Sequence, residues 1–248
     1  MYRLTCLLIP LVLVAGIHAE AQTWEESLAP GDSLYGLYDY GGSIPYYREA
    51  CSLDSNRFEL FWKLGRSLNM KGESAPRDSQ LVIFEEARDA EKRALELNEA
   101  DADAHFQLAR ALGKIALFKG IFKSVSLAKQ VRREAQRALQ LDSLHDGAWH
   151  VLGRWHRDVG KKPKILRLPM GLSAANKKDA LAFMKRAVEL NPEYVNHHLE
   201  MGITYLRLKD KDAARMEFEK TLELPSQRPL DEKYKSEAKK YLAEMDRK

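Results

Sequence analysis

The sequence predicts an all-α protein: a right-handed helical solenoid with elongated repeats and a capping helix at its C-terminal end. A segment of the form Ala-x-x-Leu-Asx occurs four times, beginning at Ala50, Ala94, Ala138 and Ala187. A bulky residue follows each of these alanines at a fixed distance of eleven positions. A Leu or Met stands three positions after the bulky residue, and a Gly or Ala comes next. A register kept through four copies is typical of stacked helix pairs, so the sequence indicates a solenoid.

Composition agrees with a folded helical chain and excludes some functions. The 248 residues are 45% hydrophobic, which suffices for a packed core, and 9 Pro and 14 Gly leave long stretches free to form helix. The 40 Lys and Arg nearly balance the 36 Asp and Glu, and a net charge of +4 does not indicate a nucleic-acid partner.

The first 21 residues resemble an export signal. Arg3 supplies a positive charge, the run from Leu4 to Val14 is almost wholly apolar, and Ala19-Glu-Ala21 fits the small-residue cleavage rule. We therefore expect cleavage after about Ala21 and a periplasmic location, with an uncleaved anchor as the alternative. Cleavage would leave Cys51 as the sole cysteine, and a chain without disulfides suits the periplasm.

The remaining chain divides into a short lead-in and the array. Residues 22–41 combine Gly, Pro, Asp and Tyr without a helical period, so we expect an irregular lead-in before a solenoid over residues 42–248. The expected units are a half repeat at 42–55, then 56–99, 100–143, 144–192 and 193–226, with a cap at 229–247. The second helices of the four full units are expected at about Gln80–Leu97, Ser126–Leu141, Asn176–Leu190 and Lys211–Leu224.

The spacing of the units shows where residues have been inserted. The first three alanines are 44 residues apart and the next interval is 49, but the interval from Ala187 to Thr221 is 34. Of the three insertions, Met70–Arg77 contains Gly and Pro and is expected to be a loop. Lys114–Val125 contains no Pro and is expected to lengthen both helices. Gly160–Ala175 contains two Pro and cannot be one helix.

The last unit resembles the tetratricopeptide repeat, whose period is 34 residues. His198-x2-Met201-Gly202-x2-Tyr205 continues to Ala214-x3-Phe218, with Thr221 where Ala is usual. Ala148–Met245 as a whole resembles the regulator of microtubule dynamics family of divergent tetratricopeptide proteins. The matching segments are Leu152-Gly-Arg-Trp155, Ala180-Leu-x-x-Met-x-x-Ala187, Leu190-Asn-Pro-Glu-Tyr194 and Met201-Gly-x-x-Tyr205.

This resemblance implies an interaction scaffold or a lipid-handling protein. The matching motifs are packing motifs, which specify a fold and carry no chemistry. An exported chain would not meet microtubules, so we do not transfer a microtubule role to it.

Three arginines occupy equivalent positions in successive units. Arg66, Arg110 and Arg154 each follow the small Gly or Ala, and Trp62, Phe106 and His150 stand four residues before them. An i, i+4 pair shares a helix face, so each unit would present a ring beneath a guanidinium group on the concave side. We expect these six residues, with Arg157, to line a groove that grips an acidic peptide or an anionic head group. In the alternative, each Arg stacks on its own ring or pairs with a Glu, without any ligand.

Basic residues also surround the third insertion. Lys161, Lys162, Lys164 and Arg167 alternate with Ile165, Leu166 and Leu168. Such a loop can dock on an anionic membrane surface. The alternative is a solvated loop whose apolar residues tuck against the solenoid.

Enzyme motifs are missing from the sequence. It contains no H-E-x-x-H, G-x-S-x-G or phosphate-binding glycine loop, and His150 and His156 are spaced six apart, on different helix faces. We therefore expect no catalytic residues, no metal and no cofactor. The function expected is a non-enzymatic scaffold that binds an acidic peptide or protein segment. The alternative is binding or transfer of an anionic lipid at a membrane surface.

Overall fold

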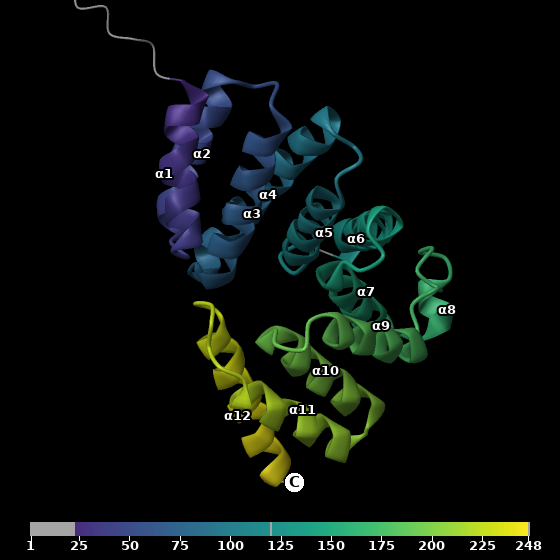
Figure 1. The fold of residues 1–248 in the computed structure, drawn as a ribbon. Coiled ribbons are helices and arrows are strands. Elements are labelled where there is room, and N and C mark those ends of the chain that lie inside the picture. The colour runs from purple at the N-terminus through teal and green to yellow at the C-terminus, as the bar shows by residue number, and fades with distance from the viewer. Residues whose placement is uncertain (1–22, 120, 248) are drawn as a thin grey trace, which may run out of the picture.

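The computed structural model describes residues 23–119 and 121–247, and this part of the chain forms twelve helices (Figure 1). The expected export signal lies outside the described residues. In chain order the helices are α1 (Trp24–Gly36), α2 (Tyr40–Leu53), α3 (Phe58–Ser74), α4 (Arg77–Leu97), α5 (Ala102–Ala116), α6 (Ile121–Leu141), α7 (Asp146–Val159), α8 (Lys164–Arg167), α9 (Lys177–Leu190), α10 (Val195–Leu208), α11 (Lys211–Glu223) and α12 (Asp231–Asp246). No helix in the described ranges is both long and apolar enough to span a bilayer.

The helices stack as antiparallel pairs. The pairs are α1 with α2, α3 with α4, α5 with α6, α7 with α9 and α10 with α11, while α8 lies in a connection and α12 covers the last pair. The first helices of successive units, α3, α5, α7 and α10, also contact one another. They therefore form the inner side of the curve that Figure 1 shows. The predicted all-α solenoid with a C-terminal capping helix is confirmed.

The repeated Ala-x-x-Leu-Asx segment ends each second helix and turns the chain into the next unit. The four alanines are completely buried. Asp54, Asn98 and Asp142 each accept, through Oδ1, the backbone N–H two residues further on, at 3.0, 3.1 and 2.9 Å. This side-chain turn competes with further helix and fixes where the next helix starts.

In three of the four units, the bulky residue eleven positions later ties the first helix to the turn before it. Its ring nitrogen contacts the backbone carbonyl six residues earlier: Nε2 of His105 at 3.0 Å, Nε1 of Trp149 at 2.9 Å and Nε2 of His198 at 2.9 Å. The two histidines also contact a Glu of the paired helix through Nδ1, each at 2.8 Å. The fixed spacing thus serves hydrogen bonding as well as packing.

The expectation of an irregular lead-in over residues 22–41 is wrong. Thr23 begins α1 with a reciprocal capping box to Glu26, and α1 pairs fully with α2, so the first unit is a complete pair and not a half repeat. The fully buried residues of α1 are Ser27 and Gly31, and Trp24, Leu28 and Tyr35 on the same helix pack, partly buried, against the core. A β-carbon at Gly31 would lie 2.8 Å from the Tyr47 ring, so the helices approach closely only with glycine there. The helix was missed because Pro30 and Gly31 stand inside it, between these apolar residues.

The expectation that the first insertion, Met70–Arg77, is a loop is wrong for its first part, which is helical. Helix α3 continues to Ser74, and Gly72 lies inside it, where a β-carbon would come within 2.6 Å of Phe84. Gly72 therefore permits close packing and does not end the helix. The second insertion extends α6 back to Ile121, and the third contains only the short α8, which agrees with the expected helix break.

Candidate functional site

A cavity of about 230 Å³ opens on the inner side, chiefly between α5 and α7. Part of α6, the end of α3, Tyr194 and the start of α10 complete its wall. Apolar side chains form one part of the lining: Phe106, Leu117, Val131, Val151, Trp155 and Val159. Charged or polar side chains form the other part: Glu73, Arg110, Lys114, His150, Arg154, Asp158, Tyr194, Asn196 and His197.

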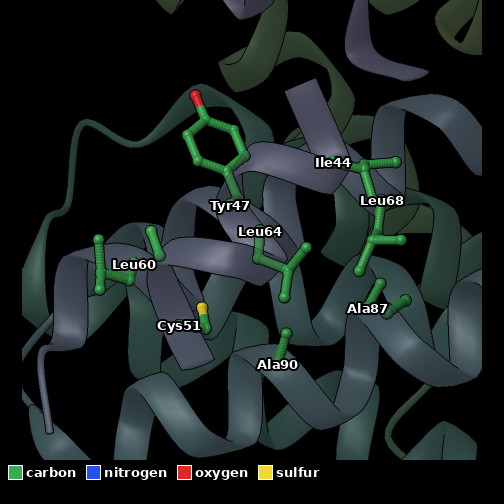
Figure 2. Close-up of a cluster of buried hydrophobic side chains, with 10 residues drawn as sticks. Ile44, Tyr47, Cys51, Leu60, Leu64, Leu68, Ala87 and Ala90 are labelled. Atoms are coloured by element: carbon green, nitrogen blue, oxygen red, sulfur yellow. The ribbon is translucent and has the colours of Figure 1, made fainter. Parts of the chain in front are cut away.

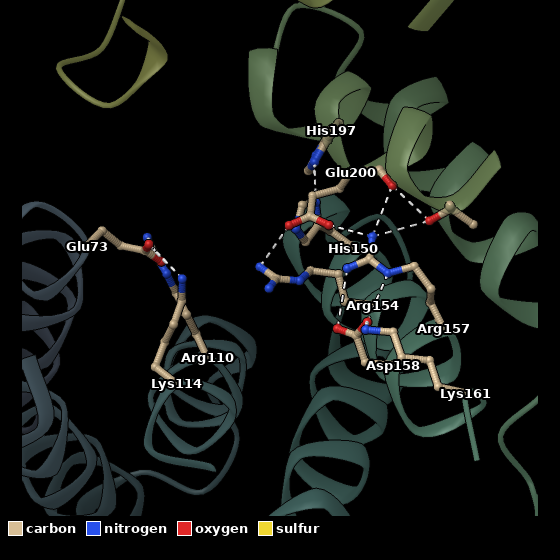
Figure 3. A network of polar contacts seen from close by, with 11 residues as sticks. Glu73, Arg110, Lys114, His150, Arg154, Arg157, Asp158, Lys161, His197 and Glu200 are labelled. Atoms are coloured by element: carbon tan, nitrogen blue, oxygen red, sulfur yellow. Dashed lines mark hydrogen bonds and ion pairs between the residues drawn. The ribbon is translucent and has the colours of Figure 1, made fainter. Parts of the chain in front are cut away.

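Glu73 at the end of α3 holds two cations of α5. Lys114 Nζ donates to Glu73 Oε2 at 2.6 Å, and Arg110 Nη2 donates to Glu73 Oε1 at 3.4 Å (Figure 3). Burial opposes ionisation of Glu73, but the charges of Lys114 and Arg110 outweigh burial and lower the pKa of Glu73 to about 2. Burial lowers the pKa of Lys114, against the pull of Glu73. One carboxylate thus serves two cations at this wall.

A second carboxylate, Glu200 of α10, lies between two arginines of α7. Arg157 donates to Glu200 Oε2 at 2.6 Å and to the Glu200 carbonyl at 3.2 Å, and Arg154 contacts Glu200 Oε1 at 3.1 Å. Burial raises the pKa of Glu200, but Arg154 and Arg157 outweigh it and lower that pKa. The Arg157 side chain is 6% exposed and also binds Asp158, whereas the Arg154 side chain remains 31% exposed and lines the cavity. In Figure 3, Arg154 extends toward the Glu73 cluster.

His150 is held by a buried chain of hydrogen bonds. Its Nδ1 lies 2.8 Å from Nδ1 of His197, whose Nε2 lies 2.9 Å from Oδ2 of Asp146. Burial, with the neighbouring charges of His197 and Arg154, lowers the pKa of His150 well below its usual value and keeps the ring neutral. Since a carboxylate only accepts, His197 carries its proton at Nε2, and His150 must donate from Nδ1. His150 Nε2 is then a proton-free acceptor, and no hydrogen bond to it occurs among the described residues.

The three expected arginines do not form one ladder in the cavity. Arg110 and Arg154 line it with Phe106 and His150, but Arg66 and Trp62 do not, and neither does Arg157. The Arg66 guanidinium lies between two rings, 3.9 Å from the centroid of Tyr35 and 4.3 Å from that of Trp62. Tyr35 belongs to α1, so the helix that the sequence did not reveal covers this position. The core beside it joins α2, α3 and α4 through Tyr47, Leu64 and Ala87 (Figure 2).

Arg110 and Arg154 lack the expected ring stacking. Arg110 Nη1 contacts Met70 Sδ at 3.1 Å in addition to Glu73. Phe106 packs on His145 at 4.6 Å between ring centroids, and His150 packs on His197 at 4.9 Å. The i, i+4 stacking thus occurs at Trp62 and Arg66, while the other two arginines pair with carboxylates.

The basic loop is also arranged differently from the expectation. Lys161, Lys162 and Lys164 are exposed, but Arg167 is only 6% exposed and cannot face a membrane. Its guanidinium donates to the backbone carbonyls of Lys162, Leu172 and Ala175 at 2.8, 3.0 and 2.5 Å. The Arg167 side chain points into the loop because it donates hydrogen bonds to these three carbonyls there.

Sequence reasoning missed several cavity residues. Glu73 was placed in an expected loop, and Tyr194 comes from a different repeat, as does Glu200, which pairs with Arg154 of the lining. Lys114 stands four residues after Arg110 on the same face of α5, and this spacing was a usable signal. Within the described ranges, no group of three or more His, Cys, Asp or Glu is arranged to hold a metal ion.

Comparison with solved structures supports the repeat architecture. The chain is similar to TTC0263, a thermophilic tetratricopeptide protein of Thermus thermophilus, with a TM-score of 0.66 and 15% identity over 89% of this chain and 100% of that one. It is also similar to MamA from Desulfovibrio magneticus RS-1, with a TM-score of 0.55 and 16% identity over 83% of this chain and 97% of that one. At such identities the likeness establishes the fold alone.

Comparison with curated sequences and family models gives the family. Regulator of microtubule dynamics protein 1 of Bos taurus is 28% identical over 91% of this chain and 74% of the relative. The Mus musculus protein of the same name is 26% identical over 92% of this chain and 76% of the relative. The model of the family described as "Regulator of microtubule dynamics protein 1-3" matches residues 29–246. The chain therefore belongs to the regulator of microtubule dynamics protein 1-3 family.

Proposed function

We propose that this protein is a non-enzymatic scaffold that binds an acidic peptide segment of a partner in the cavity between α5 and α7. The observation that carries the proposal is the excess of cations there. Its lining has three cations, Arg110, Lys114 and Arg154, against the two carboxylates of Glu73 and Asp158. Arg110 and Lys114 share Glu73, and Arg154 shares Glu200, behind the lining, with the buried Arg157. The tetratricopeptide-like fold is an interaction fold, which agrees with a binding role.

Arg154 is the group best placed to meet the ligand. Among the described residues its one contact with a carboxylate uses Nη1, and the side chain, 31% exposed, lines the cavity. A guanidinium group presents several donors in one plane, so Arg154 can bind a ligand carboxylate while it keeps Glu200. The expected groove residue Arg66 does not contribute in this proposal.

The other cavity groups narrow the ligand chemistry. His150 Nε2 accepts, so the ligand should present an N–H or O–H donor there, which a peptide backbone supplies. The apolar wall with Leu117, Val131 and Trp155 suits a large apolar side chain next to the acidic one. A volume of about 230 Å³ is below the ~300–1,000 Å³ of pockets that enclose whole small ligands. The cavity therefore fits a short part of a longer chain.

A peptide library tests this proposal. Each member would pair one Asp or Glu with one large apolar residue, and a matched library would carry Asn or Gln instead. Fluorescence anisotropy would compare the wild type with Arg154→Gln and with Arg207→Gln, an exposed arginine of α10 outside the cavity. Loss of a charge-assisted pair should lower the affinity of Arg154→Gln for acidic peptides roughly 10- to 100-fold. The affinity of Arg207→Gln should stay that of the wild type. Equal binding of acid and amide libraries would refute the proposal.

An anionic lipid is the second candidate, and the apolar wall favours it. Leu117, from the second insertion, and Val159, beside the third, both line the cavity. Native mass spectrometry of the purified protein separates the two candidates. An anionic lipid retained by the wild type and lost from Arg154→Gln would support the lipid, whereas a bare mass in both would count against it. The acidic-peptide proposal rests on the library result.

A further inference from the structure

The connection between α7 and α9 exposes three large apolar side chains within four residues. Ile165 is 79% exposed, Leu166 55% and Leu168 63%. In Figure 1 the short helix α8 stands at the outer edge of the molecule, beside the pair formed by α7 and α9. The alternative reading, in which the apolar side chains of this loop tuck against the solenoid, is wrong for these three. Apolar groups that gather at the tip of an otherwise polar loop mark an interaction site.

The loop beneath this tip is well anchored. Arg167 sits inside it and donates to three backbone carbonyls, as described above. Leu172 is 5% exposed and Ala175 1%, and both join the core cluster around Trp155. Gly171 adopts a φ of 66°, which permits the turn between α8 and these buried residues. The loop therefore holds its apolar tip outward by its own packing.

Lysines surround the tip. Lys161, Lys162 and Lys164 are exposed just before it, and Lys177 and Lys178 are exposed at the start of α9. The acidic side chains nearby are Asp158, which pairs with Lys161 at 2.9 Å, and Asp179, which lies near His156. Lys162 and Lys164 have no acidic partner among the described residues. The buried charge of Arg167 meets only carbonyls, so it adds to the positive potential.

We propose that the loop from Lys161 to Leu168 docks the protein reversibly on an anionic membrane surface. Ile165, Leu166 and Leu168 enter the boundary between head groups and acyl chains, and the lysines contact lipid phosphates. An exposed apolar tip surrounded by lysines fits an anionic membrane surface. Burial of the apolar side chains in the membrane is favourable, and the lysine ammonium groups at their base contact the negatively charged head groups. Insertion is shallow because α8 has four residues. This surface lies outside the cavity, so the proposal does not depend on the cavity ligand.

Vesicle co-sedimentation tests the proposal with the full chain. The probes are phosphatidylcholine vesicles and vesicles with one quarter phosphatidylglycerol. Wild type should bind the anionic vesicles and bind the neutral ones far more weakly. The variant Ile165→Ser/Leu166→Ser/Leu168→Ser should lose at least tenfold in affinity for the anionic vesicles. Each Lys→Gln change at Lys162 or Lys164 should cost roughly fivefold and reduce the dependence on salt.

A matched variant controls for the loss of surface hydrophobicity. Val82, Leu144 and Met216 are 67%, 62% and 69% exposed and lie on other parts of the array. Their triple change to Ser should leave vesicle binding unaltered, and thermal melts should show that both variants fold. Equal loss in the two triple variants, or equal binding to neutral and anionic vesicles, would overturn the proposal. A wild-type dimer in sedimentation velocity that only the loop variant loses, without vesicle binding, would instead show that this tip packs on a second copy.

Discussion

Replacing Glu73 with Gln tests whether one buried carboxylate holds the cationic cavity wall together. The Glu73 side chain is 10% exposed, and Lys114 and Arg110 both donate to it. These charges outweigh burial and lower the pKa of Glu73 from 4.5 to about 2. Since one pKa unit corresponds to about 1.4 kcal/mol, the ionised carboxylate contributes roughly 3 kcal/mol to stability at neutral pH. This free energy describes Glu73 alone and not the Glu73–Lys114 pair, because burial lowers the pKa of Lys114 and so disfavours its charged form.

The sign of the pH dependence follows from the lowered pKa. The folded state holds the proton of Glu73 more weakly than the unfolded state, so the contribution is complete above pH 4.5 and disappears as the pH falls toward 2. Urea unfolding should therefore show Glu73→Gln less stable than the wild type by roughly 3 kcal/mol at neutral pH, and by about half that near pH 3.

A control variant makes this measurement decisive. Glu223 is 68% exposed and contacts Lys220 at 3.5 Å, so Glu223→Gln should change stability by less than about 0.5 kcal/mol at any pH. A difference for Glu73→Gln that stays constant between pH 3 and neutral pH would refute the electrostatic reasoning. So would a difference at neutral pH as small as that of the control.

The same substitution should strengthen ligand binding. Glu73 competes with an incoming carboxylate for Arg110 and Lys114, so its neutral replacement frees both cations. Acidic peptides selected from the library should bind Glu73→Gln several-fold more tightly than the wild type, although the protein is less stable. Anisotropy titrations at neutral pH would check this, and weaker binding would contradict the assigned role of the cavity.

Three further substitutions have expected outcomes. Glu91 is completely buried, and its carboxyl oxygens have no hydrogen-bond partner among the described residues. Burial raises the pKa of Glu91 well above 4.5. The stability of the wild type should therefore fall by about 1.4 kcal/mol for each pH unit above 4.5, as long as the folded state keeps the proton. Urea unfolding against pH should show that Glu91→Gln abolishes this slope. Gly202→Ala places a β-carbon 2.5 Å from Phe218 and should cost ~1–3 kcal/mol in thermal unfolding, whereas Gly36→Ala, with open space around it, should not. Lys233→Met removes a 2.6 Å bond to the carbonyl at the end of α3 and should speed hydrogen exchange in α12.

The repeat was predictable because its signals are local. The Asx residue that turns the chain and the ring eleven positions after the Ala both act between residues that are close in the sequence, so their spacing appears there directly. Helix α1 was not predicted, because Pro30 and the closely packed Gly31 interrupt the apolar spacing of Trp24, Leu28 and Tyr35. Gly72 was misread for a related reason: a glycine in a helix can serve close packing as well as a helix end.

The cavity was only partly predictable. The positions of Arg110 and Arg154 on the inner face follow from the repeat, and both line the cavity. Their partners do not follow, since Glu73 and Glu200 come from neighbouring units and Arg66 is covered by Tyr35 of α1. Contacts between units therefore decide which arginine stays open to a ligand. These contacts differ among the equivalent positions of the repeat.

The most direct test of the binding proposal observes the Arg154 side chain itself. In ¹⁵N-labelled protein, the Nε–H signal of Arg154 can be assigned by its loss in Arg154→Lys, and that of Arg207 likewise. We predict that titration with the tightest acidic peptide from the library shifts the Arg154 signal saturably, with the Kd found by anisotropy, and leaves the Arg207 signal in place. Saturation of binding with an unmoved Arg154 signal would show that the peptide binds elsewhere and would contradict the proposed site.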